Sequence, residues 1–312
     1  MPVSRYHSCR SLSTSSPFAL CLVLMGVFVI SGCGKSVPNM LTLTHDIESI
    51  VAQVDSAMVS VTLIDTANDL RFNIEGDRLY HAASTMKVPV IIELFRQAEL
   101  GRFALDDEIV LKNEFHSIVD GSLFSIEDDS DDAIYEQLGQ PMTLRQLSYQ
   151  MITVSSNLAT NLFIDLLSAD SVQATSERLG TTHMKTIRGV EDLKAFDLGL
   201  SNQATSNDLA LLMERLRTGT AVSPAADSVM LGFLHDQFFN AMIPSGLPEG
   251  TKVAHKTGSI TRIHHDAAIV YPENGEPYVL VIMVQGIMDN QVSSDLGSAI
   301  ARLIHSRIRA ES

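Results

Sequence analysis

Strand-forming segments lie near both ends of this chain, and a long stretch of helical pattern separates them. Residues 58–65 (MVSVTLID) alternate in polarity and are rich in β-branched side chains, and residues 70–74 can return beside them after a polar turn. Strand character comes back at 265–271 and at 278–285. Between about residues 85 and 240 the apolar positions follow the period of a helix, most clearly at 90–100, 144–152, 158–167 and 208–216.

The predicted fold class is therefore α/β in the broad sense and α+β in the narrow one. We expect an antiparallel sheet built from both chain ends and flanked by helices, with an inserted all-helical lobe over about 88–245. Thr44 and Asp46 are expected to begin one flanking helix, and the apolar stripe of Leu296, Ile300 and Ile304 predicts the other. A binding site is expected in the cleft between the sheet and the lobe.

The first residues have the pattern of an export signal. Arg5 and Arg10 precede an uncharged apolar run, residues 18–32, that is short for a bilayer span and fits the core of a signal peptide. The run ends in Ile30-Ser31-Gly32-Cys33, which resembles the bacterial lipobox, whose cysteine receives lipid. This pattern predicts a lipoprotein signal peptide at 1–32 and a lipidated tether at 33–43. A plain secretory signal or an uncleaved anchor is the alternative.

Lipid on Cys33 would fix an exported protein to the periplasmic face of a bacterial envelope, with the membrane as its partner. The other two cysteines, Cys9 and Cys21, lie in the predicted signal peptide, so no thiol remains for a disulfide, a thiolate metal site or a thiol nucleophile. The formal charge of −15, from 22 Lys+Arg and 37 Asp+Glu, repels phosphate backbones and argues against a nucleic-acid partner.

Three short motifs occur in order along the chain: Ser84-Thr85-Met86-Lys87, Ser155-Ser156-Asn157 and Lys256-Thr257-Gly258. The first two are short enough to arise by chance, whereas Lys-Thr-Gly is rarer and the order of all three is informative. On a helix Ser84 and Lys87 share one face. A buried lysine amine has a lowered pKa and can accept the proton of a neighbouring serine, which makes the serine nucleophilic. An ordinary helix cap is the alternative for Ser84.

Ser-x-x-Lys, Ser-Asp-Asn and Lys-Thr-Gly are the signature of class A β-lactamases and penicillin-binding proteins. The chain resembles this serine-hydrolase superfamily, and the class A branch most. The likeness extends to residues 151–162 and to 255–259 with the following 266–272, and it covers 44–312 as one serine β-lactamase-like catalytic domain.

The resemblance implies roles for the reacting groups. Ser84 would attack the substrate carbonyl and become acylated, with Lys87 as base or proton store. Ser155 would relay a proton to the leaving nitrogen. The backbone N–H groups of Ser84 and Ser259 would form the oxyanion hole. The resemblance implies no cofactor and no metal, and a monomer.

The resemblance also implies binding residues. Asn157 would contact the amide side chain of the substrate, while Lys256 and Thr257 would face its carboxylate. Ser259 belongs to the same substrate-binding group. Arg262 is a candidate for a second carboxylate contact, with an ordinary surface arginine as the alternative.

Two positions depart from the family pattern. Ser156 replaces the usual aspartate of the second motif. Class A enzymes activate the hydrolytic water with the glutamate of a Glu-x-x-x-Asn loop; Glu191 has the right spacing, but Ala195 follows it in place of asparagine. Glu191 is thus the candidate base for deacylation, and a loop carboxylate paired with Arg188 is the alternative. Asn202 is a candidate for the residue that closes this loop.

The acidic segment 120–136 and the run His264-His265-Asp266 have no assigned role. The segment is expected to be a solvated loop; a calcium site from Asp128, Asp129, Asp131 and Asp132 and a place at the mouth of the cleft are the alternatives. Neighbouring histidines on a strand point to opposite faces, which disfavours one shared metal ion.

The sequence therefore predicts a serine hydrolase that forms an acyl-enzyme on Ser84 and hydrolyses β-lactams. Activity on D-Ala-D-Ala peptides of peptidoglycan or on esters, and a β-lactam-binding sensor with little turnover, are the alternatives.

Overall fold

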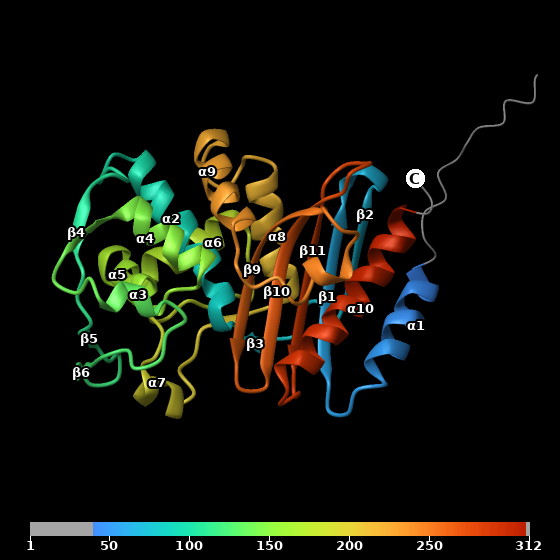
Figure 1. Ribbon diagram of the computed structural model, residues 1–312, viewed down its shortest axis with the longest axis horizontal. Helices are drawn as coiled ribbons and strands as arrows, with labels where there is room; N and C mark the ends of the chain where they lie inside the picture. Colours follow the sequence, from blue (N-terminus) through green and yellow to red (C-terminus); the bar gives the residue numbers. More distant parts are fainter. Residues whose placement is uncertain (1–39, 310–312) are drawn as a thin grey trace, which may run out of the picture. The chain divides into compact units, whose positions relative to one another are not determined.

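The computed structural model describes residues 40–309, and Figure 1 labels its elements. The helices are α1 (Met40–Val51), α2 (Lys87–Glu99), α3 (Asp132–Tyr135), α4 (Leu144–Thr153), α5 (Asn157–Leu167), α6 (Ala169–Leu179), α7 (Leu193–Asp197), α8 (Ser206–Arg217), α9 (Pro224–His235) and α10 (Asn290–Arg309), with short 3-10 turns η1 (Thr66–Asn68), η2 (Ala83–Met86) and η3 (Pro244–Gly246). The strands are β1 (Met58–Asp65), β2 (Leu70–Ile74), β3 (Tyr80–His81), β4 (Glu108–Val110), β5 (Phe115–His116), β6 (Leu123–Phe124), β7 (Pro141–Thr143), β8 (Gln203–Ala204), β9 (Lys252–Ile260), β10 (Ile263–Tyr271) and β11 (Tyr278–Gln285).

Five strands from the two ends of the chain form one antiparallel sheet in the order β2-β1-β11-β10-β9. The first of them, β1, pairs with β11 from Met58 opposite Gln285 to Ile64 opposite Val279. This pairing confirms the predicted sheet built from both chain ends. Almost every residue of β1 and β11 is buried, because both faces of the sheet are covered.

Alternate residues of the central strands belong to two different hydrophobic cores. Leu280 and Val270 pack with α1 and α10, which lie side by side on one face of the sheet (Figure 1). Val281 and Ile269 face the other core, which α8 and the helices of the lobe complete. The sheet therefore separates the layer of α1 and α10 from the helical lobe. Side chains of the lobe can reach β9 on the face of the sheet that carries α8.

The inserted lobe is mainly helical, as predicted, but not entirely. Strand β4 pairs with β7 and β5 pairs with β6, and each pair is only two or three residues long. The prediction of an all-helical lobe is wrong in this detail. Segments this short carry too few alternating residues to be recognised from the sequence.

Helix α1 begins earlier than the sequence indicates. It includes Met40, so Thr44 lies inside the helix and does not cap it. Leu43 and Ile47 are both buried against α10, and this i, i+4 pair extends the apolar stripe one turn towards the N-terminus. Residues 40–43 therefore belong to the folded body and not to the tether predicted at 33–43. Cys33 and the predicted signal peptide lie outside the described residues.

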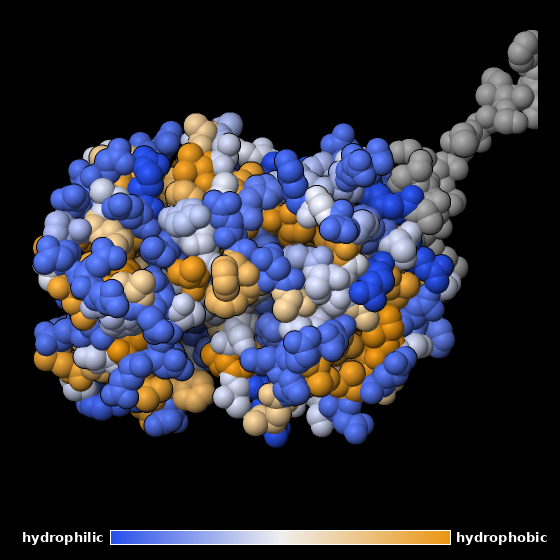
Figure 2. Space-filling model, in the orientation of Figure 1, coloured by the Kyte–Doolittle hydropathy of each residue, from blue (hydrophilic) through white to orange (hydrophobic). Residues whose placement is uncertain are grey.

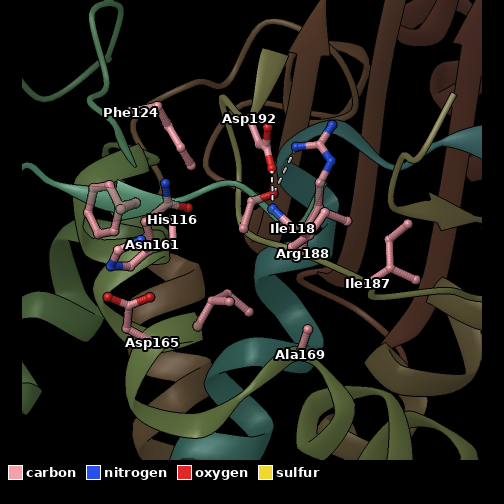
Figure 3. A pocket seen from close by; sticks show the side chains of 12 residues that line it. His116, Ile118, Phe124, Asn161, Asp165, Ala169, Ile187, Arg188 and Asp192 are labelled. Atoms are coloured by element: carbon pink, nitrogen blue, oxygen red, sulfur yellow. Dashed lines mark hydrogen bonds between the residues drawn. The ribbon is translucent and has the colours of Figure 1, made fainter. Parts of the chain in front are cut away.

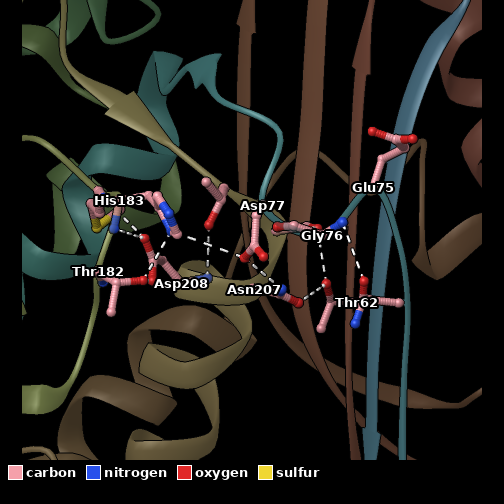
Figure 4. A network of polar contacts seen from close by, with 12 residues as sticks. Thr62, Glu75, Gly76, Asp77, Thr182, His183, Asn207 and Asp208 are labelled. Atoms are coloured by element: carbon pink, nitrogen blue, oxygen red, sulfur yellow. Dashed lines mark hydrogen bonds and ion pairs between the residues drawn. The ribbon is translucent and has the colours of Figure 1, made fainter.

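A polar network at the start of α8 connects the sheet to the lobe (Figure 4). Asp208 accepts hydrogen bonds from the backbone N–H groups of Thr182, His183 and Met184 at 3.0, 2.8 and 2.6 Å. The preceding Asn207 accepts a bond from Thr62 Oγ1 on β1 at 2.8 Å. Because these contacts join the sheet, α8 and the lobe, they fix the cleft between the two parts.

Polar side chains cover most of the face shown in Figure 2, and the apolar residues that appear there are interspersed among them. Within residues 40–309 no helix combines the length and the apolar character needed to cross a bilayer.

Candidate active site

Ser84 lies in η2, the tight turn that leads directly into α2. Ala83 before it has φ +46°, in the left-handed region that non-glycine residues rarely adopt. The Nδ1 atom of His81 accepts a hydrogen bond from the N–H of Ala83 at 3.0 Å and stabilises this conformation. Burial lowers the pKa of His81 to about 4, and the charge of Arg188 lowers it further. The ring is therefore neutral near pH 7, as an acceptor at Nδ1 requires. The strained turn presents Ser84, half-buried, to the cleft.

The glycine of the third motif allows β9 to approach this turn. A Cβ atom at Gly258 would lie 2.9 Å from the backbone nitrogens of Ser84 and Thr85 and 3.2 Å from the carbonyl oxygen of Ala82. These neighbours are backbone atoms and cannot rotate away. Only glycine at position 258 therefore permits the observed contact between the third motif and the serine turn.

Lys87 is completely buried one turn after Ser84. Its ammonium group donates to the carbonyl oxygen of Ser155, to Ser155 Oγ at 3.2 Å and to Asn157 Oδ1 at 2.9 Å. Burial lowers the pKa of Lys87 to about 7, although the negative charges of Asp129 and Glu191 oppose this effect. A substantial fraction of the amine is thus neutral near pH 7 and can accept a proton.

Ser155 connects the two lysines of the motifs. Its backbone has φ +64°, which turns the side chain towards the centre of the site. Lys256, on β9, donates to the same Ser155 Oγ at 3.0 Å. Burial lowers the pKa of Lys256 well below its ordinary value, and the charge of Lys87 lowers it further. The result is a continuous hydrogen-bonded chain of Lys87, Ser155 Oγ and Lys256, along which a proton can move.

Glu191 faces the same cleft as Ser84, from the loop 187–202. Its backbone is also in the left-handed region, with φ +59°. Burial and the charge of Asp128 raise its pKa, whereas Arg188 and Lys87 lower it. The guanidinium of Arg188 instead donates to the carbonyl oxygens of Leu200 and Gly189 at 2.7 and 3.0 Å. Arg188 and Glu191 form no close ion pair in the described part of the chain, and Arg188 acts on Glu191 through its charge.

Three side chains hold the loop that carries Glu191, and Figure 3 labels two of them, Asn161 and Asp192. Asn161 accepts a bond from Val190 N at 2.7 Å and donates to its carbonyl oxygen at 3.0 Å. Asp192 accepts a bond from Ile118 N at 2.9 Å. Asn202 accepts a bond from the N–H of Ile187 at 2.9 Å and closes the loop, which is the place expected for it. The neighbours of Glu191 are thus fixed on both sides.

The Glu191 carboxylate itself makes no hydrogen bond to any residue between 40 and 309. Ala195, four positions later, offers no polar side-chain atom that could share a water with it. The loop therefore presents one acidic group to the cleft without a side-chain partner.

A cleft of about 330 Å³ lies between the serine turn, this loop and the end of β9. Four of the residues predicted for the site line it, namely Ser84, Asn157, Glu191 and Ser259. Lys87, Ser155, Lys256 and Thr257 are buried beside it.

The structure does not bring Arg262 to this group. It occupies the tight turn between β9 and β10 with φ +62°, is exposed, and its Nε contacts Met288 Sδ at 3.1 Å.

Two residues near the site were not identified from the sequence. One is His81, three positions before Ser84, which supports the serine turn. The other is Asp129, whose carboxylate accepts hydrogen bonds from Asn157 N and Leu158 N. The expectation of a simple solvated loop is therefore wrong at Asp129. The run 128–132 has two aspartates on each side of one serine, and its sequence pattern does not indicate which carboxylate points inward.

Within residues 40–309 no three His, Cys, Asp or Glu side chains are grouped so as to bind a metal ion. His265 is fully buried, donates from Nε2 to the carbonyl oxygen of His81 and accepts from Val284 N, which gives this ring a structural role.

Comparisons with known proteins agree with this geometry. The model of the beta-lactamase enzyme family matches residues 42–308. The chain is 23% identical over 276 residues to a beta-lactamase of Rhodobacter capsulatus. The match covers 84% of this chain and 90% of the relative. Among solved structures it is similar to a beta-lactamase of Sphaerobacter thermophilus, with 27% identity, a TM-score of 0.72 and coverage of 83% and 95% of the two chains.

A second similar structure is a leucine-to-glutamate mutant of PBP-A, solved as an acyl-enzyme complex with penicillin G. It has 25% identity and a TM-score of 0.76, and the match covers 86% of this chain and 97% of that one. Because the family model spans most of the sequence and the fold agrees, the chain belongs to the beta-lactamase enzyme family, as a class A β-lactamase-like serine hydrolase.

Proposed function

We propose that this chain hydrolyses β-lactam antibiotics through an acyl-enzyme on Ser84. The observation that carries the proposal is the buried chain of Lys87, Ser155 Oγ and Lys256 beside the cleft that Ser84 lines, with Lys87 one turn after Ser84. It supplies a proton acceptor for the serine and a proton donor for a leaving nitrogen within one hydrogen-bonded network. Membership of the beta-lactamase enzyme family gives the substrate class.

In the proposed acylation step, neutral Lys87 accepts the proton of Ser84 Oγ, and the oxygen attacks the carbonyl carbon of the lactam. The negative charge on the former carbonyl oxygen is stabilised by the backbone N–H groups of Ser84 and Ser259. As the carbon–nitrogen bond breaks, Ser155 Oγ gives its proton to the nitrogen. The ammonium of Lys87 then returns a proton to Ser155, which balances the step.

Substrate binding would use the groups on either side of this chain. The Asn157 amide is already oriented, because Lys87 donates to its oxygen and its Nδ2 donates to the carbonyl oxygen of Asp128 at 3.3 Å. It is the proposed contact for the amide side chain of the substrate. Lys256 and Thr257 are proposed to face the carboxylate of the substrate. Arg262 as a further carboxylate contact would need a side-chain movement away from Met288.

Deacylation requires a water molecule activated on the other side of the acyl carbon. Glu191 is the proposed base, since it is half-buried and lines the cleft together with Ser84. Its raised pKa makes it a stronger proton acceptor than an exposed glutamate. A second candidate function, a β-lactam sensor that stays acylated, is favoured by the absence of a side-chain partner for Glu191 within the described residues.

The experiment that decides between these functions follows product and adduct together. A soluble form beginning at Lys35 is mixed with a chromogenic cephalosporin, and colour and intact mass are recorded. Sustained colour with a transient mass gain is the expected result. A stoichiometric burst with a stable adduct would select the sensor. Neither colour nor adduct would contradict both and favour a peptide or ester substrate.

We also propose that the mature protein is a monomer fixed to the periplasmic side of the membrane through lipid on Cys33. The pattern Ile30-Ser31-Gly32-Cys33 supports this proposal. The full chain, expressed in a Gram-negative host, is expected to fractionate with membranes, and Cys33→Ser is expected to move it to the soluble or unprocessed fraction. Equal incorporation of a labelled fatty acid into parent and variant would contradict lipidation of Cys33, and sedimentation of the soluble form tests the monomer.

A further inference from the structure

The second motif of this chain lacks a charged group that the family pattern contains. Ser156 stands at the position of the aspartate in Ser-Asp-Asn. Its hydroxyl caps α5 by accepting a hydrogen bond from Ala159 N at 3.3 Å, but it brings no negative charge. Because the first N–H groups of a helix attract anions, the start of α5 still favours a carboxylate.

A carboxylate from elsewhere in the chain occupies this place. Asp129 accepts hydrogen bonds from Asn157 N at 2.8 and 2.9 Å and from Leu158 N at 2.9 Å. The hydroxyl of Tyr135 donates to the same carboxylate at 2.8 Å and fixes its orientation. These are the first two residues of an 11-residue helix, so Asp129 stabilises the start of α5 together with the cap at Ser156.

The residues on either side of Asp129 form hydrogen bonds to the turn at 154–157, which leads into α5. Ser130 Oγ donates to the carbonyl oxygen of Val154 at 2.6 Å. The carbonyl oxygen of Asp128 accepts a bond from the Asn157 amide at 3.3 Å. Together the segment contacts both sides of the turn that contains Ser155, whose left-handed backbone needs external support.

The charge of Asp129 also reaches the reacting groups. It is the first of the two charges that raise the pKa of Lys87 against the effect of burial, with Glu191 as the second. Lys256 on β9 faces Lys87 from the other side, and Lys87 lowers the pKa of Lys256. Asp129 also contributes to the raised pKa of Glu191.

The acidic neighbours of Asp129 do not carry the same role. Asp131 is buried, and its burial followed by the charge of Asp129 raises its pKa. Asp128 is exposed, and its charge acts on Glu191. Asp132 is exposed in the first turn of α3, where it has no bond to α5. Asp131 forms a hydrogen bond with the side chain of Ser156, whereas Asp129 is the acidic side chain of this segment that accepts from the backbone N–H groups of α5.

We propose that Asp129 is a positioning residue of the active site: its carboxylate fixes the start of α5, and with it Ser155 and Asn157, in place of the aspartate missing at Ser156. This inference rests on the proposed acylation of Ser84. It implies that the charge at position 129 shifts the pH range in which Lys87 works as a base.

The test compares Asp129→Asn with the matched control Asp132→Asn by single-turnover acylation with a chromogenic cephalosporin across pH 5 to 9. We expect Asp129→Asn to lower the rate of acylation roughly 10- to 100-fold, because Asn157 and Ser155 lose their fixed position. Its acid limb should move to lower pH, because Lys87 loses a charge that raises its pKa. A change confined to protein structure would lower the rate without moving the limb. Asp132→Asn is expected to match the parent.

Two further variants keep the outcome decisive. Asp129→Glu retains the charge but displaces it, so its rate should fall while its acid limb stays in place; it also carries the test if Asp129→Asn does not fold. In the Asp129→Asn background, Ser156→Asp is expected to recover part of the rate. A parent-like rate and limb in Asp129→Asn, a parent-like rate in Asp129→Glu or an equal limb shift in Asp132→Asn would overturn the proposal. A parent protein that is never acylated would instead overturn the proposed function.

Discussion

Glu191→Gln is expected to accumulate a stable acyl adduct on Ser84. Glutamine is close in size to glutamate but cannot accept a proton from water, and general-base catalysis contributes about 10²- to 10⁴-fold to a rate. Deacylation should therefore fall by roughly 10³-fold, while acylation remains within reach of the parent rate. Intact mass after mixing with a chromogenic cephalosporin gives the adduct directly, and the colour trace should change from steady turnover to one burst per active site.

The matched control for this variant is Glu127→Gln. Glu127 is exposed and lines a neighbouring pocket together with Glu191, so it tests the loss of a nearby charge without loss of the proposed base. The control is expected to turn over like the parent. If Glu191→Gln deacylates as fast as the parent, the base must be another group. If the parent itself traps the acyl-enzyme, then Glu191 does not support deacylation in this protein, and the absence of a polar side chain at Ala195 is the proposed reason.

Much of the fold could be predicted from the sequence, because the pattern of apolar residues within each segment indicates a strand or a helix. The strand-like segments lie at the two ends of the chain, so they are expected to share one sheet. The short, β-branched and mostly apolar segments at 58–65 and 278–285 predict buried strands, and they pair edge to edge across the two chain ends. The spacing of Ser84 and Lys87 likewise follows from one helical turn. The glycine of Lys-Thr-Gly has a cause visible only in three dimensions, since backbone atoms of the serine turn lie where its Cβ would be.

The parts of the site that could not be predicted depend on which way a loop side chain points. Asp129 and Asp132 are chemically equivalent in the sequence, yet one bonds the start of α5 and the other is exposed. Arg262 follows the third motif closely, but the tight turn between β9 and β10 directs it to Met288. Such orientations are set by tertiary contacts and not by spacing along the chain.

The two buried lysines indicate a conflict between stability and function at this site. Burial costs a cation much more free energy than it costs a neutral amine, and the structure tolerates two amines on either side of one hydroxyl. Packing around Lys87 does not require a cation there, because its immediate neighbours on α2, Val88, Pro89 and Val90, are buried and apolar. The amine is therefore expected to reduce stability while it enables acylation.

Lys87→Met should thus give a protein that is more stable than the parent on the acid side and that is not acylated at a useful rate. The pKa of Lys87 is lowered from its ordinary value of 10.5 to about 7 in the folded state. Between these values the unfolded chain binds a proton that the folded chain has released, so parental stability rises with pH across this window. Below pH 7 the destabilisation is complete, on the order of 5 kcal/mol.

Methionine removes the cost of burying the charged amine. It also leaves the Ser155 and Asn157 oxygens without the Lys87 donor, and each oxygen that finds no other partner costs about 1 to 3 kcal/mol. Ser155 Oγ retains Lys256 and its carbonyl oxygen retains Ser130, so the loss falls mainly on Asn157. The expected net gain is about 2 kcal/mol at pH 6. It should shrink and then reverse as the pH approaches 10. Loss of the general base should slow acylation by roughly 10³-fold or more.

Denaturant unfolding at pH 6 and pH 9, with Lys87→Arg as the control, measures the sign of the effect. Arginine keeps its charge at both values and cannot release its proton, so its stability relative to the parent should fall between pH 6 and pH 9. Two results would show that burial does not lower the pKa of Lys87 to about 7. One is a Lys87→Met protein that is less stable than the parent at pH 6. The other is a gain in stability that is the same at pH 6 and pH 9. The proposed role of Lys87 as the base would then lose its physical basis, even if the variant were inactive. Because unfolding needs no substrate, this measurement tests the base independently of which β-lactam the enzyme prefers.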